Sequence, residues 1–122
     1  MDDDILIIDD EDDIIHFMRR VLMRAGYRVR TASDGATALT VIANRAPAVV
    51  LLDWGLPDIS GEMVLAHLHT AHPTVPVIVI TGDPRPVQAL GFSVVQHILL
   101  KPFELTELLT IVAPYVVAHR SV

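Results

Sequence analysis

The sequence predicts a single α/β domain over residues 1–122, built on a parallel β-sheet. Short apolar runs recur along the chain, and between them lie segments whose apolar residues follow helical spacing. Most of these runs are continuously apolar, which is typical of strands covered on both faces, as in a parallel sheet. Strands that alternate with helices favour parallel pairing through right-handed crossovers. We therefore expect one sheet that is covered on both faces.

Five segments are expected to form the strands of this sheet. Four are the apolar runs Ile5 to Ile8, Val49 to Leu52, Val75 to Ile80 and His97 to Leu100. The fifth, Tyr27 to Ala32, alternates between polar and apolar residues and is therefore typical of an edge strand.

The intervening segments predict helices. The first begins at Asp12, a plausible N-cap, and ends at Gly26. Ser33 or Asp34 caps the second helix. The remaining helices are expected at Glu62 to Ala71, at Pro86 to Leu90 and from Leu105 to Val116. Because Pro114 removes a backbone donor, the last helix should kink or stop there.

Composition and charge exclude several classes of protein. The chain has no cysteine, which excludes disulfides and thiolate chemistry. Its net charge is −6, with acidic residues crowded near the amino terminus, whereas a nucleic-acid surface needs a basic footprint. No apolar run approaches the roughly 18 residues of a membrane span, and the acidic start "MDDD" is unlike a secretory signal. We expect a cytoplasmic domain that binds neither nucleic acid nor membrane.

Polar residues end four of the predicted strands. They are Asp9 and Asp10 after the first strand, Asp53 after the third, Thr81 after the fourth and Lys101 after the fifth. Each one alone is explained by a turn, a helix cap or a solvated charge. In open parallel sheets, however, ligands bind beyond the carboxyl ends of the strands. The five side chains are therefore expected to meet at one edge of the sheet.

The three carboxylates predict a divalent cation. Like charges at close range force a proton onto one group or require a cation, and an all-oxygen cluster of so few carboxylates suits Mg²⁺. Phosphoryl transfer would use the whole set, because it needs an attacking group, a metal, a second cation and a donor. Asp53 stands alone and is the natural nucleophile, whereas Asp9 and Asp10 are better placed to hold the ion. Lys101 would pair with Asp53 and then with a phosphoryl oxygen, to which Thr81 would donate.

Matches to a known family are carried by the segments "ILIIDDEDD", "VVLLDWGLPDISG", "VIVITGD" and "ILLKPF". With these motifs, in this order and over essentially its whole length, the chain closely resembles the receiver domains of two-component response regulators. The resemblance implies a flavodoxin-like, doubly wound five-stranded parallel sheet of strand order 2-1-3-4-5, with helices on both faces.

The resemblance also implies a phosphoacceptor and a metal site. Asp53 would accept a phosphoryl group from a phosphohistidine, so the domain would be a phosphorylation-dependent signalling switch. Mg²⁺ would be bound directly by Asp10, Asp53 and the backbone carbonyl of Gly55, and through water by Asp9.

Two further positions match residues that respond to phosphorylation in this family. Thr81 resembles the switch hydroxyl. Lys101 resembles the family lysine, whose bond to the following proline, here Pro102, is cis. A cis bond is physically plausible because only X-Pro bonds tolerate it at low cost.

The implied partners are proteins. A sensor histidine kinase or a histidine phosphotransfer protein would supply the phosphoryl group. The rim of the first helix, with Ile15, Arg19 and Met23, would suit the docking of this partner. A downstream protein target would then bind according to the phosphorylation state. Whether the chain acts alone or belongs to a longer regulator or hybrid kinase stays open at this point.

Other functions fit the same residues less well. A Mg²⁺-dependent phosphohydrolase with an aspartyl-phosphate intermediate uses a second aspartate two residues after the nucleophile, where this chain has Gly55. A flavin-binding module on the same fold would need a phosphate loop after the first strand, and the acidic residues there would repel a phosphate.

The chain also departs from the family pattern. Ile98, with His97 beside it, stands where many receivers have an aromatic residue that accompanies the switch. The segment between Thr81 and Lys101 is short and rich in proline, so we expect a short or displaced fourth helix and weak or absent dimerisation through the face of the fourth and fifth helices. Gly55 is expected to leave the site open to water, and Asp83 to influence the lifetime of the phosphoryl group.

Three histidines near the end of the third helix predict only ordinary exposed polarity. A spacing of two puts His67 and His69 on nearly opposite sides of a helix, so only His69 and His72 are expected to share a face.

Overall fold

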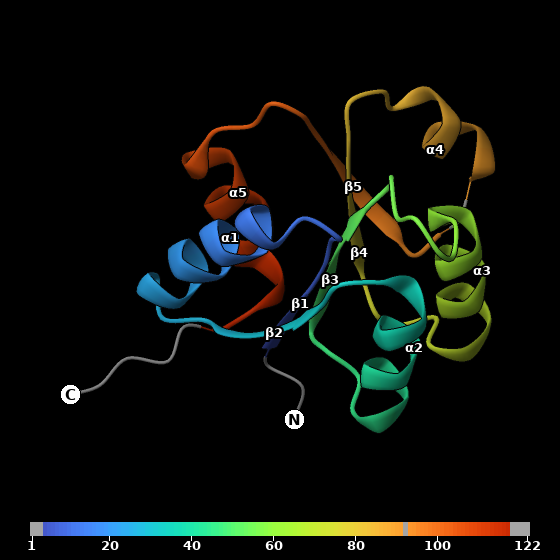
Figure 1. Cartoon of the computed structure of the whole chain (residues 1–122), viewed down its shortest axis with the longest axis horizontal. Helices are drawn as coiled ribbons and strands as arrows, with labels where there is room; N and C mark the ends of the chain where they lie inside the picture. Colours follow the sequence, from blue (N-terminus) through green and yellow to red (C-terminus); the bar gives the residue numbers. More distant parts are fainter. Residues whose placement is uncertain (1–3, 92, 118–122) are drawn as a thin grey trace.

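The computed structural model describes residues 4–91 and 93–117 as a five-stranded sheet between two layers of helices (Figure 1). Its strands are β1 Asp4–Ile8, β2 Arg28–Ala32, β3 Val49–Asp53, β4 Val77–Thr81 and β5 Val95–Leu100. The strand order is β2-β1-β3-β4-β5, and all neighbours are parallel. The predicted doubly wound fold and strand order are therefore confirmed. Of the acidic amino terminus, Asp2 and Asp3 lie outside the described residues.

Helices connect the successive strands, and further helical segments follow the last strand. They are α1 Asp12–Arg24, α2 Gly35–Asn44, α3 Gly61–Ala71, α4 Arg85–Leu90 and α5 Leu105–Val112, followed by the short 3₁₀ helix η1 Ala113–Tyr115. As Figure 1 shows, α1 and α5 cover one face of the sheet, and α2, α3 and α4 cover the other. Within the described ranges, no helix is both long enough and apolar enough to cross a membrane.

The three inner strands explain the continuous apolar runs. Every residue of β1, β3 and β4 is buried, because each of these strands has a neighbour on both sides and a helix layer on both faces. Along β1, Ile5 and Ile7 pack toward α1 and α5, whereas Leu6 and Ile8 pack toward α2 and α3. Two cores therefore flank the sheet, and alternate residues of one strand belong to different cores.

Strand β5 corrects one expectation. The run from His97 to Leu100 was expected to be covered on both faces, yet only Leu99 is buried among the residues of this strand. The physical reason is position: β5 lies at the edge of the sheet and pairs only with β4. Both edges of the sheet are thus partly exposed, whereas the sequence pattern indicated one.

The helix ends follow local chemistry with one exception. Asp34 caps α2, accepting a hydrogen bond from Thr37 N at 2.7 Å. Helix α1 ends at Arg24, shortly before Gly26, whose φ of 96° lies in the left-handed region that favours glycine. The expected cap of α1 was wrong: Asp12 is the first helical residue, and Glu11 holds the cap position without a side-chain bond.

The two proline-containing segments behave as expected. Helix α4 has six residues, with Pro86 in its first turn, and Gly91, whose φ is 65°, caps its carboxyl end. The expectation of a short fourth helix is confirmed. Helix α5 stops at Val112, just before the 3₁₀ turn that contains Pro114. Weak dimerisation through the face of α4 and α5 stays a prediction.

Candidate functional site

The carboxyl ends of the strands place the predicted residues at one edge of the sheet. Asp53 and Thr81 are the last residues of the neighbouring strands β3 and β4, and Asp9 follows β1 directly. Backbone hydrogen bonds continue the strand pairing past these positions, from Asp9 N to Ala32 O at 3.1 Å and from Lys101 N to Thr81 O at 2.9 Å. The site residues are therefore held by the ladder of the sheet itself.

Three carboxylates converge there. Ligand oxygens of Asp9, Asp10 and Asp53 all lie within 4.8 Å of one another. Asp9 is 1% exposed and Asp53 5%, whereas Asp10 is exposed. Like charges held this closely repel one another unless a cation lies between them. The sequence-based prediction that these three side chains meet is confirmed by this geometry.

The environment of Asp9 tests whether a cation fits. Its Oδ1 accepts a hydrogen bond from Glu11 N at 2.9 Å, but its buried Oδ2 has no partner within the part of the chain that the structure describes. Burial raises the pKa of the Asp9 carboxyl, and the charges of Asp53 and Glu11 raise it further. The hydrogen bond from the Glu11 amide and the charge of Lys101 lower the pKa, but by less. A buried carboxylate oxygen without a donor fits a cation, and the all-oxygen set fits Mg²⁺.

Lys101 brings a positive charge to the carboxylates. Its Nζ lies 3.0 Å from Asp53 Oδ1, and the bond that follows it, to Pro102, is cis as expected. Burial lowers the pKa of Lys101, but the hydrogen bond and charge of Asp53, with the charges of Asp9 and Glu11, outweigh burial and raise it. The lysine is therefore held in its charged form beside Asp53.

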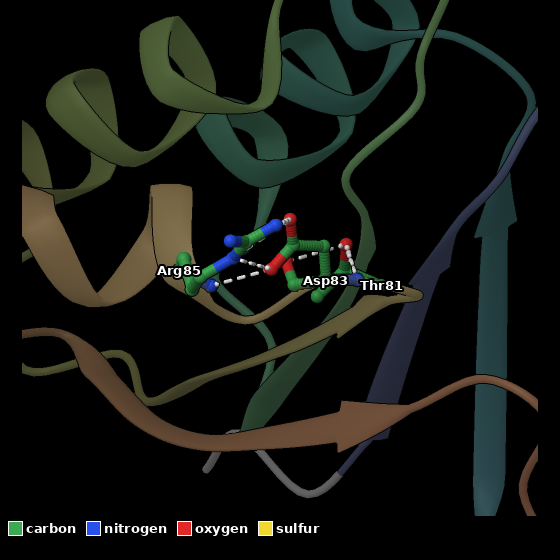
Figure 2. A network of polar contacts seen from close by, with 3 residues as sticks. All are labelled: Thr81, Asp83 and Arg85. Atoms are coloured by element: carbon green, nitrogen blue, oxygen red, sulfur yellow. Dashed lines mark hydrogen bonds and ion pairs between the residues drawn. The ribbon is translucent and has the colours of Figure 1, made fainter.

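Figure 2 shows that the Thr81 hydroxyl is engaged by the turn that follows β4. Thr81 Oγ1 donates to the backbone oxygen of Asp83 at 3.2 Å and accepts from Asp83 N at 3.2 Å. The hydroxyl hydrogen must therefore leave the Asp83 carbonyl before it can be donated to a ligand at Asp53.

The same turn is stiffened by a second set of contacts. The Asp83 carboxylate accepts from Arg85 N at 3.0 Å and from Arg85 Nη2 at 2.8 Å (Figure 2). These bonds from the Arg85 side chain and backbone lower the pKa of Asp83 to about 2. Asp83 is thus ionised and tied to Arg85, an interaction that the sequence alone did not indicate.

Two glycines in the segment after Asp53 differ in their surroundings: Gly55 has space for a side chain and Gly61 does not. A Cβ added to Gly55 would meet only Asp53 Oδ2, at 3.9 Å, so the surroundings of this residue are open. A Cβ added to Gly61 would lie 2.5 Å from Cε3 of Trp54. The Trp54 ring therefore packs on the start of α3. Trp54 is adjacent to Asp53 in the sequence, but its side chain contacts the core between the sheet and α3.

One residue near the site escaped the sequence analysis. Asp58 lies between β3 and α3, and its two carboxylate oxygens accept hydrogen bonds from Gly35 N at 2.9 Å and Ala36 N at 3.1 Å. These partners are 23 and 22 residues away along the chain, so no local pattern could indicate the contact.

Two expected surface features differ from the structure. Ile15 is buried against the sheet, so the rim of α1 retains only Arg19 and Met23 of the three residues named for docking. The rings of His67 and His72 approach to a centroid distance of 6.4 Å, whereas His69 Nδ1 lies 3.4 Å from Ser93 Oγ. The sequence indicated only that His69 and His72 could share a face, and the contact between His67 and His72 forms where His72 leaves the helical conformation at the end of α3.

Comparison with known proteins decides the family. The family model for the response regulator receiver domain matches residues 5–113. The chain belongs to this family. Receiver domains are phosphorylation-dependent signalling domains of two-component systems, and they bind Mg²⁺ at an acidic cluster of the kind formed here by Asp9, Asp10 and Asp53.

The similar proteins include a transcriptional regulatory protein and a histidine kinase. The transcriptional regulatory protein KdpE of Mycobacterium tuberculosis is 44% identical over 108 residues, which cover 86% of this chain and 47% of KdpE. The circadian input-output histidine kinase CikA of Synechococcus elongatus is 36% identical over 108 residues, covering 87% of this chain and 14% of CikA. The chain thus spans about half the length of KdpE and a small part of CikA.

Solved structures confirm the fold of the receiver domain. The receiver domain of NtrX from Brucella abortus matches with a TM-score of 0.83 and 32% identity, covering 93% of this chain and 98% of that one. The chemotaxis response regulator CheY4 of Vibrio cholerae matches with a TM-score of 0.84 and 25% identity, over 95% of this chain and 100% of that one.

Proposed function

We propose that residues 1–122 form one receiver domain in which Asp53 accepts a phosphoryl group in a Mg²⁺-dependent reaction. The donor is a phosphohistidine of a sensor histidine kinase or a histidine phosphotransfer protein. The observation that carries the proposal is the buried Asp53 at the end of β3, paired with Lys101 at 3.0 Å and within 4.8 Å of Asp9 and Asp10.

The transfer step follows from this arrangement. A carboxylate oxygen of Asp53 attacks phosphorus, a P–O bond forms, and the P–N bond to the donor imidazole breaks with its electron pair going to nitrogen. The residues that would hold Mg²⁺ are Asp10, Asp53 and the Gly55 carbonyl directly, with Asp9 acting through water. When bound, the ion neutralises charge on the phosphoryl oxygens.

Two side chains respond once Asp53 is modified. Lys101 Nζ, which bonds Asp53 Oδ1 in the unmodified protein, pairs with a phosphoryl oxygen instead. The Thr81 hydroxyl leaves the Asp83 carbonyl and donates to another phosphoryl oxygen. This exchange moves the turn before α4 and thereby changes the surface that a downstream protein binds.

The phosphoryl group is lost by hydrolysis at the same site. Water attacks phosphorus, the P–O bond to Asp53 breaks with its electron pair returning to the carboxylate, and inorganic phosphate leaves. The open surroundings of Gly55 give the water access. We also propose that Asp83 influences this step, and its ion pair with Arg85 limits how freely its carboxylate can move. The domain catalyses only its own phosphorylation and dephosphorylation. A phosphohydrolase acting on an external substrate would need a general acid where Gly55 stands.

The partners follow from the surfaces that the site leaves accessible. The phosphoryl donor binds next to Arg19 and Met23 on exposed positions of α1. We propose a cytoplasmic location. We also propose that this domain does not bind nucleic acid or membrane directly, because its net charge is −6.

The proposal is tested with a small phosphodonor. Acetyl phosphate and Mg²⁺ are added to the parent protein, to Asp53→Asn and to Thr70→Ala, an exposed position of α3 that serves as the control. We expect mass spectrometry to detect one phosphoryl group on the parent and the control and none on Asp53→Asn. Beryllium fluoride should change Trp54 fluorescence in the same two proteins. Equal labelling of Asp53→Asn, or an unlabelled parent, would contradict the proposal.

A further inference from the structure

The segment between β3 and α3 is fastened to a neighbouring helix. Asp58 bonds two successive backbone amides at the start of α2, those of Gly35 and Ala36. Next to it, Ile59 packs so closely on Gly35 that a Cβ added there would lie 2.9 Å from Ile59 Cβ. The loop and the helix are therefore joined by two hydrogen bonds and by a contact that only glycine allows.

The start of α2 is a favourable anchor for a carboxylate. The first amides of a helix lack partners within the helix, and they carry partial positive charge. Asp34, the local cap, satisfies only Thr37 N. The amides of Gly35 and Ala36 hold the pKa of Asp58 below its usual value, so the anchoring carboxylate stays ionised.

The fastened loop carries the proposed metal ligand. On one side of Gly55, Trp54 N donates to Ile80 O at 3.0 Å, which fixes the chain to β4. On the other side, Leu56 is buried and Pro57 has a restricted φ before the chain reaches Asp58. Few free backbone torsions therefore remain between the two anchors, and the Gly55 carbonyl lies among them.

We propose that Asp58 is a positioning residue for the metal site. It does not touch the cation; its bonds to α2 hold the loop that carries the Gly55 carbonyl in the conformation that binds Mg²⁺. This inference rests on the proposed function. Without the bonds, Mg²⁺ binding must also order the loop, and the lost conformational entropy weakens binding.

The chain offers a matched control for this role. Asp34 and Asp58 cap the same helix, but only Asp58 belongs to the loop of the site. Asp34→Ala and Asp58→Ala should lower the midpoint of urea unfolding in EDTA to similar extents. Only Asp58→Ala should raise the Kd for Mg²⁺, measured by calorimetry, on the order of ten-fold, as when groups that orient a metal ligand are removed.

Two further variants separate positioning from loss of stability. Asp58→Asn retains one acceptor oxygen, so its Kd should lie between those of the parent and Asp58→Ala. Gly35→Ala keeps the carboxylate but pushes Ile59 away, and it should also raise the Kd. At saturating Mg²⁺, labelling of Asp58→Ala by acetyl phosphate should recover the parent's rate, because the reacting groups are intact.

The outcomes distinguish this inference from the function it rests on. A parent that binds no Mg²⁺ would overturn both. A parent that binds Mg²⁺ while Asp58→Ala or Asp58→Asn binds it equally well would overturn the positioning role alone. An equal rise of Kd in Asp34→Ala would also overturn it, because the effect would then belong to the helix and not to the loop.

Discussion

Lys101 Nζ lies 3.0 Å from Asp53 Oδ1, and this ion pair joins the end of β3 to the residue that follows β5. The two residues are 48 positions apart. Among the residues that the structure describes, this pair brings a cation to a site whose other charged groups, Asp9 and Asp10, are carboxylates. Lys101 and a bound Mg²⁺ would therefore compensate the same negative charge.

Lys101→Met should affect stability and metal binding in opposite directions. Without the lysine, the buried Asp53 carboxylate loses its cation, and the free energy of unfolding in EDTA should fall by about 1 kcal/mol, a modest value because the lysine is partly exposed. Mg²⁺ should bind more tightly because the competing cation is gone. Urea unfolding in EDTA and calorimetric titration measure the two effects. Weaker Mg²⁺ binding by Lys101→Met would contradict this account of the charge balance.

Asp9→Asn should stabilise the metal-free protein at neutral pH. The folded state raises the pKa of Asp9 above its usual 3.8, so the folded chain binds the proton more tightly than the unfolded chain. Stability contributed by this group is therefore lost as pH rises from 3.8 through the folded pKa, and the charged form is destabilising above it.

The variant removes that charge and should gain about 1 kcal/mol in EDTA at pH 7. Because both states of the parent are protonated at Asp9 below pH 3.8, the difference between parent and variant should shrink as pH falls. Urea titrations across this range measure it, and Asp13→Asn on the exposed start of α1 is the control. A variant less stable than the parent at pH 7 would refute the prediction.

Arg85→Ala should make the Thr81 switch easier to move. Arg85 restrains the Asp83 turn whose carbonyl accepts the Thr81 hydroxyl, so its removal lowers the cost of releasing that hydroxyl. Beryllium fluoride should bind more tightly by less than about five-fold, since exposed ion pairs are weak. The gain should vanish at high salt, which already screens the pair. Gln88→Ala, exposed on α4, should bind as the parent does.

Gly61→Ala should destabilise the protein although alanine favours helices. The new Cβ would lie 2.5 Å from the Trp54 ring, and overpacking of this kind costs about 1–3 kcal/mol. The gain in helix propensity is about 1 kcal/mol in a helix interior and smaller at Gly61, the first residue of α3, so it offsets only part of that cost. Thermal unfolding and the Trp54 emission maximum should both shift. Gly55→Ala, with an open environment, is the comparison and should change stability little.

Much of the fold could be predicted because its signals are local. The run of four apolar residues from Val49 predicts a strand buried on both faces, and β3 is such a strand. Pro86 and Pro114 predict a short fourth helix and an early end of the last one, through the missing backbone donor. The same locality misled at β5, because an apolar run does not state whether a strand has one neighbour or two.

By itself, the sequence determined which side chains reach the site. Asp9, Asp53, Thr81 and Lys101 stand at the carboxyl ends of apolar runs, and parallel pairing brings the ends of such strands to one edge. Only the tertiary structure decided how those side chains are held. The bonds of Asp58 to α2 join residues far apart in the chain, and the pairing of Asp83 with Arg85 depends on the path of one turn. Such contacts depend on how the packed elements fit together, and short sequence patterns carry no information about that fit.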